Sequence, residues 1–388
     1  MSRYHSYLNS AKQILQQYNG EEPFASFLKK YFAANKKFGS KDRKQVSHLC
    51  YCFFRLGKAV MNVSLDEKIL FALFLCTDQF NEILEALKPE WNEKVDLSIE
   101  EKYSIFNNQY SMLNVFPWKE ELSEGIDYDK FCKSFFIQPD LFLRLRPGKE
   151  KLVIQKLQKA EIDFEIISDT CLALSNASKL DTVIEIDKEA VIQDLSSQKT
   201  GKYIKSSIEN KQLKISVWDC CAGSGGKSIM AYDINSEIFL TVSDSRESIL
   251  TNLKKRFETA EIKKYKCFAV DLVSKFPIPN SQFQFILCDV PCTGSGTWSR
   301  TPEQLYFFNE KKIKKYAAIQ KQIVSNVMPQ LRPGGTFIYI TCSVFKKENE
   351  EVVGFIKEKF HMTLKQMELL KGYDKKADSM FVAVMTNS

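Results

Sequence analysis

The chain has 388 residues, of which 44% are hydrophobic and 27% are charged. This length exceeds what a single hydrophobic core usually organises, so we expect two or three domains, and the composition is that of a folded globular protein. The 55 basic and 48 acidic residues leave a net charge of +7, which permits a nucleic-acid partner without requiring one.

The sequence gives no sign of a membrane segment, an export signal or a metal centre. Its polar start lacks the apolar core of a signal peptide, and its most apolar short run, residues 69–76, is far too short to span a bilayer. Eleven cysteines without a secretory signal indicate reduced thiols, and three histidines with no pair of Cys-x-x-Cys units argue against structural zinc. We therefore expect a cytoplasmic protein with no metal and no membrane contact.

Residues 1–130 are predicted to be helical. Apolar side chains recur at helical spacing between residues 7 and 32 and again between residues 46 and 56, with breaks at Gly20 and Pro23. Residues 39–43 (GSKDR) are typical of a helix start, with Ser40 as the expected N-cap. A small helical bundle with a basic edge could dock on a protein or on an RNA.

Residues 131–205 show a different pattern of expected elements, with short strands as well as a helix. We expect strands at residues 140–147, 164–167 and 171–174, a helix at 150–160 and a further short strand at 183–186. This order of elements predicts a small domain of mixed α+β character.

Residues 206–388 alternate strand-like and helix-like segments, which predicts a doubly wound, mostly parallel sheet. The first strand, residues 213–218, leads into a loop at 221–227 whose small residues would let the backbone close over a ligand at a helix N-terminus. The loop has neither the G-x-G-x-x-G spacing of dinucleotide binders nor the spacing of phosphate-binding loops, so alone it is a weak signal.

Carboxylates follow four of the predicted strands. Asp219, Asp244, Asp271 and Asp289 each stand where an apolar run ends, and ligands bind at the carboxyl ends of strands in open α/β sheets. Any one of these side chains could instead cap the next helix. The four together suit a ligand with a ribose, an amino group and a positive centre, which S-adenosylmethionine matches better than NAD or ATP.

Two strands are also followed by a thiol. The apolar run 285–288 stops at Asp289 and continues through Pro291 to Cys292, and the run 337–340 continues through Thr341 to Cys342. A carboxylate and a thiol on such an edge can hold a base and carry out chemistry on it.

These residues make the C-terminal part of the chain resemble the RNA cytosine-5 methyltransferases of the RsmB/Nop/Sun type. The resemblance rests on residues 289–292 (DVPC), 341–343 (TCS), 348–349 (EN), 225–227 (GGK) and 331–335 (LRPGG). It implies a Rossmann-like α/β methyltransferase domain at 206–388, preceded by an RRM-like α+β domain at 131–205. Residues 1–130 resemble the NusB-like RNA-binding helical domain of the bacterial RsmB branch.

The resemblance implies a reaction on cytidine that uses two thiols. Cytosine C5 becomes nucleophilic once a thiolate has added to C6, and the resemblance assigns that thiolate to Cys342 and assistance in removing the C5 proton to Cys292. Asp289 would bind the base at N3 and N4, and Lys227 would favour the thiolate of Cys342. Because the base must leave its stack, the expected partner is single-stranded or looped RNA, with ribosomal RNA favoured by the helical N-terminal domain.

The cofactor that the resemblance implies is S-adenosylmethionine. Its loop would consist of Cys221, Ala222, Gly223, Ser224, Gly225, Gly226 and Lys227. Beyond the loop, Asp244 would bind the ribose, Asp271 would lie near the adenine and Asp289 near the methionine end.

The chain departs from the family pattern in small ways, and alternatives stay open. Gly223 and Ser224 stand where relatives usually carry Ala and Pro, and Val290 replaces Ala or Pro, changes small enough to leave the backbone path intact. The alternatives are a tRNA substrate and a non-catalytic RNA-binding assembly factor. An amino-group methyltransferase would carry an aromatic residue in place of Cys292. We expect a monomer.

Overall fold

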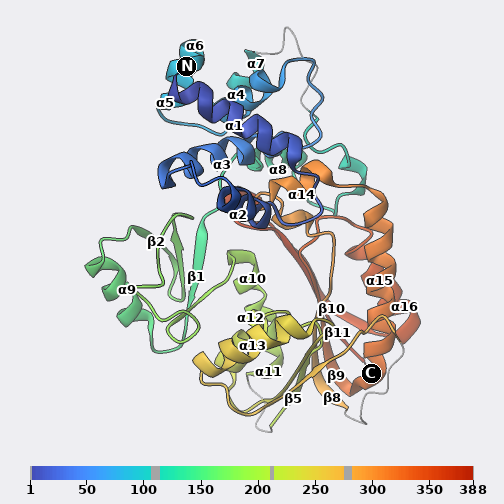
Figure 1. Cartoon of the computed structure of the whole chain (residues 1–388). Coiled ribbons are helices and arrows are strands. Elements are labelled where there is room, and N and C mark those ends of the chain that lie inside the picture. The colour runs from blue at the N-terminus through green and yellow to red at the C-terminus, as the bar shows by residue number, and fades with distance from the viewer. Residues whose placement is uncertain (1, 106–113, 210–213, 275–281, 388) are drawn as a thin grey trace. The chain divides into compact units, whose positions relative to one another are not determined.

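The computed structural model describes residues 2–105, 114–209, 214–274 and 282–387, and these residues form two compact units (Figure 1). The helical unit comprises Met1–Glu120, Asp127–Gln138 and Trp298–Asn309. The sheet unit comprises Glu121–Ile126, Pro139–Thr297 and Glu310–Ser388. Within the described ranges, no helix is long and apolar enough to cross a bilayer, and no cluster of His, Cys, Asp and Glu could hold a metal ion.

The helical unit is built from short and medium helices around an aromatic core. Its helices are α1 (Arg3–Gln17), α2 (Phe24–Ala34), α3 (Ser40–Arg55), α4 (Leu65–Leu75), α5 (Glu82–Leu87), α6 (Pro89–Asn92), α7 (Ile99–Ser104), α8 (Tyr128–Ser134) and α14 (Pro302–Phe307). The last of these comes from far along the chain. It packs into the unit through Phe307, whose ring lies 5.4 Å from Tyr18 and 6.0 Å from Phe54.

Helix α3 begins where expected, but its cap is different. Its N-cap is Gly39, and Ser40 is the first helical residue. The Asp42 carboxylate accepts a hydrogen bond of 3.0 Å from the Gly39 N–H, and the Tyr7 hydroxyl donates to the same carboxylate at 2.7 Å. The expectation of a Ser40 cap was therefore wrong by one residue, because the side chain that satisfies the helix start is three residues further on.

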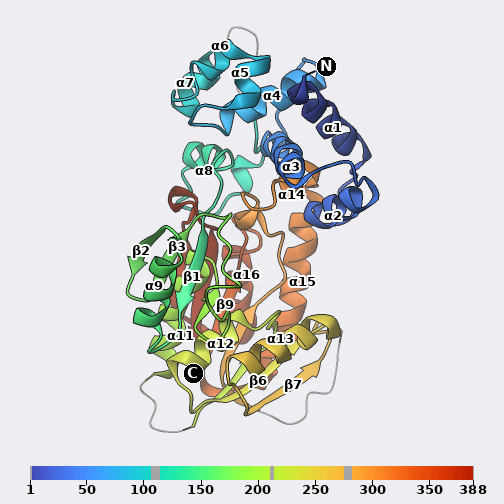
Figure 2. The ribbon, with the colours of Figure 1, turned by 60° about the vertical axis from the view of Figure 1, so that its left-hand side comes forward.

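The sheet unit contains a small four-stranded antiparallel sheet with the order β2-β3-β1-β4. Its elements are β1 (Leu141–Leu145), α9 (Glu150–Lys159), β2 (Phe164–Ser168), β3 (Cys171–Leu174) and β4 (Ala190–Ile192). Figure 2 shows α9 beside the strands, and its Val153 and Leu157 pack on Leu143 and Leu172 in one buried cluster. The expected α+β character is present, although the expected strand at 183–186 is only an isolated bridge from Ile186.

The rest of the sheet unit is a seven-stranded sheet with the order β10-β11-β9-β8-β5-β6-β7. Its strands are β5 (Ser216–Asp219), β6 (Phe239–Asp244), β7 (Tyr265–Ala269), β8 (Phe283–Asp289), β9 (Leu331–Thr341), β10 (Thr363–Leu370) and β11 (Met380–Thr386). β5 to β9 pair in parallel, and β11 runs antiparallel to both β9 and β10. The expected first strand began at Leu213, which lies outside the described residues; β5 itself starts at Ser216.

Helices cover both faces of this sheet (Figure 1). One layer consists of α10 (Leu195–Lys199), α11 (Gly201–Ile208), α12 (Gly226–Ile234) and α13 (Glu247–Thr259), and the other of α15 (Lys311–Val327) and α16 (Glu350–Phe360). Strand β8 shows why the sheet needs both layers, since Phe285 and Leu287 pack toward α12 and α13 whereas Ile286 and Cys288 pack toward α15 and α16. A strand buried on both faces reads as a continuous apolar run.

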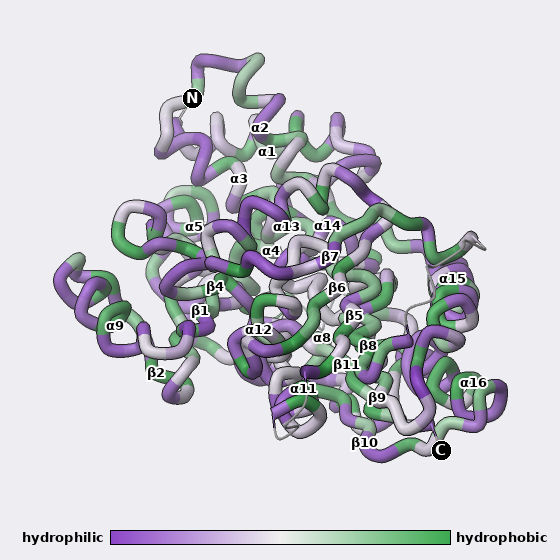
Figure 3. Tube along the Cα trace, turned by 90° about the horizontal axis from the view of Figure 1, so that it is seen from below, coloured by the Kyte–Doolittle hydropathy of each residue, from purple (hydrophilic) through white to green (hydrophobic). Residues whose placement is uncertain are grey.

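The hydropathy of the chain follows these layers. In Figure 3 the central strand β8 is largely green, whereas α15 and α16 mix purple with green. The predicted Rossmann-like α/β fold is confirmed for this part of the chain, and its strand order brings the carboxyl ends of β5, β6, β8 and β9 to one edge.

Candidate active site

The candidate site lies at the carboxyl ends of the parallel strands. Their register aligns Asp219 with Val242 and Leu287 on its two neighbours, and Asp289 with Ile340. A cavity of about 530 Å³ opens at this edge, which is within the usual range for small-molecule sites. It is lined by Cys220, Cys221, Gly223, Asp244, Ser245, Arg246, Val270, Asp271, Leu272, Val273, Asp289, Val290, Pro291, Cys292, Tyr316, Ile323 and Cys342.

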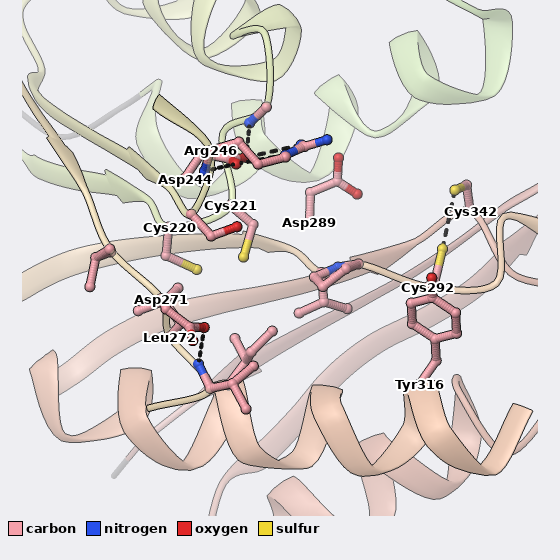
Figure 4. A pocket seen from close by; sticks show the side chains of 17 residues that line it. Cys220, Cys221, Asp244, Arg246, Asp271, Leu272, Asp289, Cys292, Tyr316 and Cys342 are labelled. Carbon is pink, nitrogen blue, oxygen red and sulfur yellow. Dashed lines mark hydrogen bonds and ion pairs between the residues drawn. The ribbon is translucent and has the colours of Figure 1, made fainter. Parts of the chain in front are cut away.

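The cavity has two chemically different ends (Figure 4). Asp244 and Asp271 lie toward one end, and the thiols of Cys292 and Cys342 lie at the other. Asp289 lies between them. This arrangement brings together three of the four carboxylates and both thiols that the sequence singled out, whereas Asp219 is buried and does not line the cavity.

The glycine loop after β5 presents backbone to the cavity. Gly225 has φ +87°, and a Cβ added there would lie 2.8 Å from Cε1 of Phe257, so a side chain would be excluded by conformation and by packing. Gly223 has φ +53° and donates its N–H to Oδ2 of Asp244 at 3.0 Å. A Cβ on Gly223 would have no heavy atom within 4 Å, so the loop leaves an open cradle beside the cavity.

The residues expected to bind the cofactor are divided by the structure into two groups. Those that line the cavity are Cys221, Gly223, Asp244, Asp271 and Asp289. Those that instead shape the loop and the start of α12 are Ala222, Ser224, Gly225, Gly226 and Lys227. The backbone cradle and the carboxylates on neighbouring strand ends suit a nucleoside with a charged amino-acid tail, so the residues present fit S-adenosylmethionine.

Some of these carboxylates also stabilise local turns. Asp271 accepts a hydrogen bond from the Val273 N–H at 3.0 Å and from the Ser274 hydroxyl at 3.2 Å. Asp244 accepts from the backbone N–H and the guanidinium of Arg246, each at 3.0 Å. Capping and ligand binding are therefore compatible at these positions, because each carboxylate has two oxygens with two lone pairs each.

The two thiols come from neighbouring strands and meet at the edge of the sheet. Cys292 Sγ and Cys342 Sγ are 3.2 Å apart. The loop that follows Cys292 is anchored by Gly296, whose N–H donates to the Cys342 carbonyl at 2.8 Å. A Cβ on Gly296 would lie 2.0 Å from the carbonyl oxygen of Ser379, so this close approach of two backbones requires glycine.

A buried ion pair lies next to the thiols. Lys227 Nζ lies 2.6 Å from Asp289 Oδ2, and their side chains are 12% and 29% exposed. Burial lowers the pKa of Lys227, but the Asp289 carboxylate and the neighbouring Cys342 more than offset this, so the pKa is raised. The hydrogen bond that the Cys292 thiol donates to Cys342, together with burial, raises the pKa of Cys292 well above its usual range. Lys227 therefore stays charged beside Asp289, and Cys292 stays protonated at neutral pH.

A second group of thiols, Cys220, Cys221 and Cys288, lies at the loop after β5. Hydrogen bonds from Cys220 and Cys288 lower the pKa of Cys221 to about 6, although burial opposes this. Cys221 lines the cavity. Cys220 and Cys288 have no exposed surface, although Cys220 lies in the wall of the cavity. The sequence placed Cys221 in the loop but gave no reason to expect an acidic thiol there.

Sequence reasoning missed Tyr316 and Arg246. Tyr316 projects from α15 toward Cys292 (Figure 4), and burial raises the pKa of its hydroxyl. A signal was present, because Tyr316 lies three or four residues from the buried Ile313 and Gln320 on one stripe of α15. Arg246 pairs with Asp244 only two residues away, a contact that spacing within a turn does not predict.

Comparisons with known proteins show the type of domain that contains this cavity. Residues 207–384 match the family model described as 16S rRNA methyltransferase RsmB/F. Residues 207–384 therefore form a methyltransferase domain of the RsmB/F type. The resemblance to the RsmB/Nop/Sun type is confirmed for this domain, and so is the assignment to the S-adenosylmethionine-dependent methyltransferases.

Curated relatives match part of the chain. The ribosomal RNA small subunit methyltransferase B of Enterobacter sp. (strain 638) is 30% identical over 189 residues, which are 45% of this chain and 40% of that protein. The protein of the same name from Erwinia tasmaniensis is 32% identical over 152 residues, 36% of this chain and 32% of that one. The chain thus spans well under two thirds of the length of these relatives.

Solved structures share the fold over a larger part of the chain. The crystal structure of PH0851 has a TM-score of 0.68 and 16% identity and covers 98% of both chains. A methyltransferase homolog protein from Pyrococcus horikoshii has a TM-score of 0.59 and 19% identity, covering 75% of this chain and 100% of that one. At these identities the likeness concerns the fold alone, and it agrees with the RsmB/F-type domain.

Proposed function

We propose that this protein transfers a methyl group from S-adenosylmethionine to C5 of a cytidine in RNA through a covalent adduct with Cys342. The observation that carries the proposal is the pair of thiols 3.2 Å apart, on separate strand ends, beside the Lys227–Asp289 ion pair. A single base entering the cavity could contact both thiols and Asp289. Such a constellation suits a reaction that needs a nucleophile and a second proton-transfer group.

The first step is addition of the Cys342 thiolate to cytosine C6, which makes C5 enamine-like. Lys227 supports this step because its ammonium group lies close enough to Cys342 for the two to interact electrostatically. The proton that Cys342 loses passes to solvent. Asp289 accepts a hydrogen bond from the N4 amino group, and it stabilises the ring as electron density shifts toward N3 and N3 takes up a proton from solvent.

When bound, S-adenosylmethionine supplies an electrophilic methyl group on a positively charged sulfur. Gly223, Asp244 and Asp271 would hold its nucleoside end, because all three line the cavity at the end away from the thiols. The adduct then carries both the new methyl group and the original proton on C5. Once its own proton has passed to solvent, Cys292 accepts the C5 proton as a thiolate. The electron pair of the C5–H bond forms the C5=C6 double bond, and the C6–S bond breaks, which returns Cys342 as a thiolate and restores the aromatic ring.

The RNA partner is supported by the surface beside the cavity. Helix α15 carries exposed lysines at 311, 312, 314 and 315, next to Tyr316, which lines the cavity. Lysines along a helix that leads to a base pocket suit the phosphates flanking an unstacked nucleotide. Ribosomal RNA is the substrate that we favour, since the curated relatives carry that word in their names.

We also propose RNA-docking roles for the parts outside the RsmB/F-type domain. The four-stranded sheet has the order β2-β3-β1-β4 with a helix between β1 and β2, which suits an RRM-like module. A second helix, between β3 and β4, is not present in the described residues 175–189. The NusB-like character of the helical unit, a monomeric state and a cytoplasmic location remain proposals on the same footing.

Alternatives from other classes are less consistent with the site. A non-catalytic assembly factor would not need two thiols in contact beside an ion pair. An amino-group methyltransferase would place an aromatic ring where Cys292 lies. A tRNA substrate is compatible with the same chemistry, so only identification of the RNA separates it from ribosomal RNA.

The test is to incubate the Cys292→Ala protein with S-adenosylmethionine and total RNA from cells that lack this protein. We expect a denaturant-resistant protein–RNA band, because addition and methyl transfer proceed but release does not. The band should disappear when Cys342→Ala is added, and sequencing of the trapped RNA identifies the nucleotide. A wild-type protein that transfers no methyl group, with no band from the variant, would refute the proposal.

A further inference from the structure

A buried carboxylate that the reaction above does not use connects the two thiol-bearing loops. Glu348 is completely buried, and each of its oxygens accepts two hydrogen bonds. Oε1 accepts from the hydroxyls of Thr293 at 2.5 Å and Ser343 at 2.7 Å. Oε2 accepts from the Thr293 N–H and from Gln320 Nε2, both at 2.9 Å. Thr293 follows Cys292 in the chain, and Ser343 follows Cys342.

We propose that Glu348 is a positioning residue that holds the Cys292 loop against the Cys342 turn, so that release of the methylated product keeps pace with methyl transfer. The proposal rests on the function proposed above. It adds a role for a residue that touches neither thiol, and it concerns one particular step. Without Glu348, we expect the Cys292 thiol to be displaced and the nucleophilic thiol of Cys342 to keep its position.

The asymmetry follows from how each loop is held. The Cys342 turn has independent supports, because Asn349 accepts from the Thr341 hydroxyl at 2.6 Å and donates to the Ser343 carbonyl at 2.9 Å. The Cys292 loop keeps the Gly296 bond to the Cys342 carbonyl, but Thr293, the residue next to Cys292, uses Glu348 for both its backbone N–H and its hydroxyl. Removal of the carboxylate would therefore free the Cys292 side more than the Cys342 side.

Helix α15 belongs to the same clamp. Gln320 is fully buried in α15, and its Nε2 donates both to Glu348 and to the carbonyl of Pro291 at 3.0 Å. Pro291 and Thr293, which flank Cys292, are thus both hydrogen-bonded to the Gln320–Glu348 pair. Gln320 Oε1 has no hydrogen-bond partner among the described residues, so the contacts that hold the loop are those of Nε2 and of the Glu348 carboxylate. Directional bonds of this kind in a buried site favour one position of the loop.

The ionisation of Glu348 agrees with this role. Burial raises the pKa of its carboxyl, and the donors on Thr293, Ser343 and Gln320 oppose the rise. Four donors around two oxygens leave no place for a proton on either oxygen unless a hydroxyl reverses its direction. Gln at this position can keep the four contacts, with its oxygen facing Thr293 N–H and Gln320 and its amide nitrogen donating to the two hydroxyls.

The experiment compares Glu348→Ala, Glu348→Gln and a control, Glu350→Gln, in the full-length protein. Glu350 is two residues away and accepts from the Ser123 hydroxyl at 2.9 Å and the Glu124 N–H at 3.3 Å, but the hydrogen bonds of its carboxylate do not involve the thiol-bearing loops. Two readouts are made. The first is bridging of Cys292 to Cys342 by dibromobimane, mapped by mass spectrometry, which needs no RNA. The second is the fraction of protein trapped as a denaturant-resistant adduct during turnover on RNA from cells that lack the protein.

In Glu348→Ala we expect bridging of the thiols to slow about tenfold and turnover to fall about 100-fold, since a displacement of about 1 Å costs this much in oriented reactions. The adduct should accumulate, as in Cys292→Ala, whereas Glu348→Gln should recover most of the turnover and Glu350→Gln should match wild type. A general loss of stability would not produce a trapped adduct or be rescued by Gln. Glu348→Ala that bridges and turns over like wild type, or that loses turnover without trapping RNA, would overturn the proposal.

A second variant keeps the test decisive if Glu348→Ala does not fold. Thr293→Val is isosteric and removes the hydroxyl bond to Oε1, together with the longer contacts of that hydroxyl with Ser295 at 3.2 Å and Ser343 at 3.3 Å, but it keeps the backbone N–H bond to Oε2. We therefore expect a smaller rise in trapped adduct. Normal bridging and no trapping in this variant would count against the clamp. Failure of the proposed function is separable, because a wild-type protein without methyl transfer can still show the loss of thiol bridging in the Glu348 variants.

Discussion

Asp219 offers a sharp test of the electrostatics beneath the active site. Its carboxyl is buried at the end of β5, where Oδ2 accepts a hydrogen bond from the Ser228 hydroxyl at 2.5 Å. Oδ1 has no hydrogen-bond partner among the described residues. Burial raises the pKa of this carboxyl from 3.8 to about 7, an effect that the Ser228 bond opposes and the nearby Asp289 reinforces.

The raised pKa fixes the sign and the size of a stability change with pH. Below pH 4 the carboxyl is protonated in both the folded and the unfolded chain. Between about pH 4 and pH 7 the unfolded chain releases a proton that the folded chain retains, so the folded state loses stability as the pH rises. Each pKa unit is worth about 1.4 kcal/mol, so the loss reaches at most about 4 kcal/mol above pH 7.

The perturbation is Asp219→Asn, which keeps the Ser228 bond through its carbonyl but cannot ionise. Its amide N–H lacks a partner, which costs about 1–3 kcal/mol at every pH. We therefore expect the variant to be no more stable than wild type at pH 4 and more stable by about 1–3 kcal/mol at pH 8. The crossing of the two stability curves is the diagnostic result.

The assay is urea unfolding at several pH values, read by pulsed hydrogen–deuterium exchange of peptides that contain β5. A local readout is needed because a chain with two compact units need not unfold in one step. Asp271→Asn is the control, since Asp271 is an exposed strand-end carboxylate and its variant should stay parallel to wild type. Parallel curves for Asp219→Asn and wild type across pH 4–8 would refute the assignment of a buried, proton-binding Asp219.

Four further outcomes follow from the geometry of the site. Lys227→Met should lower methyl transfer about 100-fold, as loss of a preorganised charge does elsewhere, while leaving RNA binding unchanged in a filter assay. Gly225→Ala should destabilise the protein by about 1–3 kcal/mol in thermal unfolding, because both the conformation and the space at that position exclude a side chain. Cys221 should be the thiol that iodoacetamide alkylates fastest at pH 7, and S-adenosylhomocysteine should protect it; equal labelling with and without this compound would count against its place in the cofactor pocket. The double substitution Lys314→Ala with Lys315→Ala should weaken RNA binding and reduce its salt dependence. The matched double substitution on α13, Lys254→Ala with Lys255→Ala, should leave both unchanged.

The sequence predicts those parts of the site that are local in the chain. The apolar run before Asp289 indicates a strand buried on both faces, and the structure has β8 there, ending at Asp289. The same holds for the strand before Cys342 and the glycine loop before Lys227, because each motif combines a hydrophobic run with the turn that ends it. Parallel strands then bring these ends to one edge without further information.

Contacts between distant segments are what the sequence leaves open. Nothing in residues 298–309 indicates that α14 packs with α3, which belongs to the N-terminal part of the chain. Arg144 and Arg146 of the small sheet both reach Asp233 on α12, at 2.6 and 2.7 Å, and neither partner can be read from spacing. Such pairings depend on how elements stack, which is set by the whole core and not by a local pattern.

The surroundings of the two thiols support the different roles proposed for them. A nucleophile needs its thiolate form, and Cys342 is the thiol that interacts with the ammonium group of Lys227. A group that assists proton transfer after the adduct has formed must not compete for the first attack, and Cys292 is held protonated because its hydrogen bond to Cys342 and its burial raise its pKa. In the proposed adduct, the Cys342 sulfur is bonded to carbon and no longer a thiolate, so it accepts the Cys292 hydrogen bond less well, and the largest cause of the raised pKa is weakened. Formation of the adduct would therefore itself lower the pKa of Cys292 at the step where proton removal is required, provided that the loop keeps Cys292 in place.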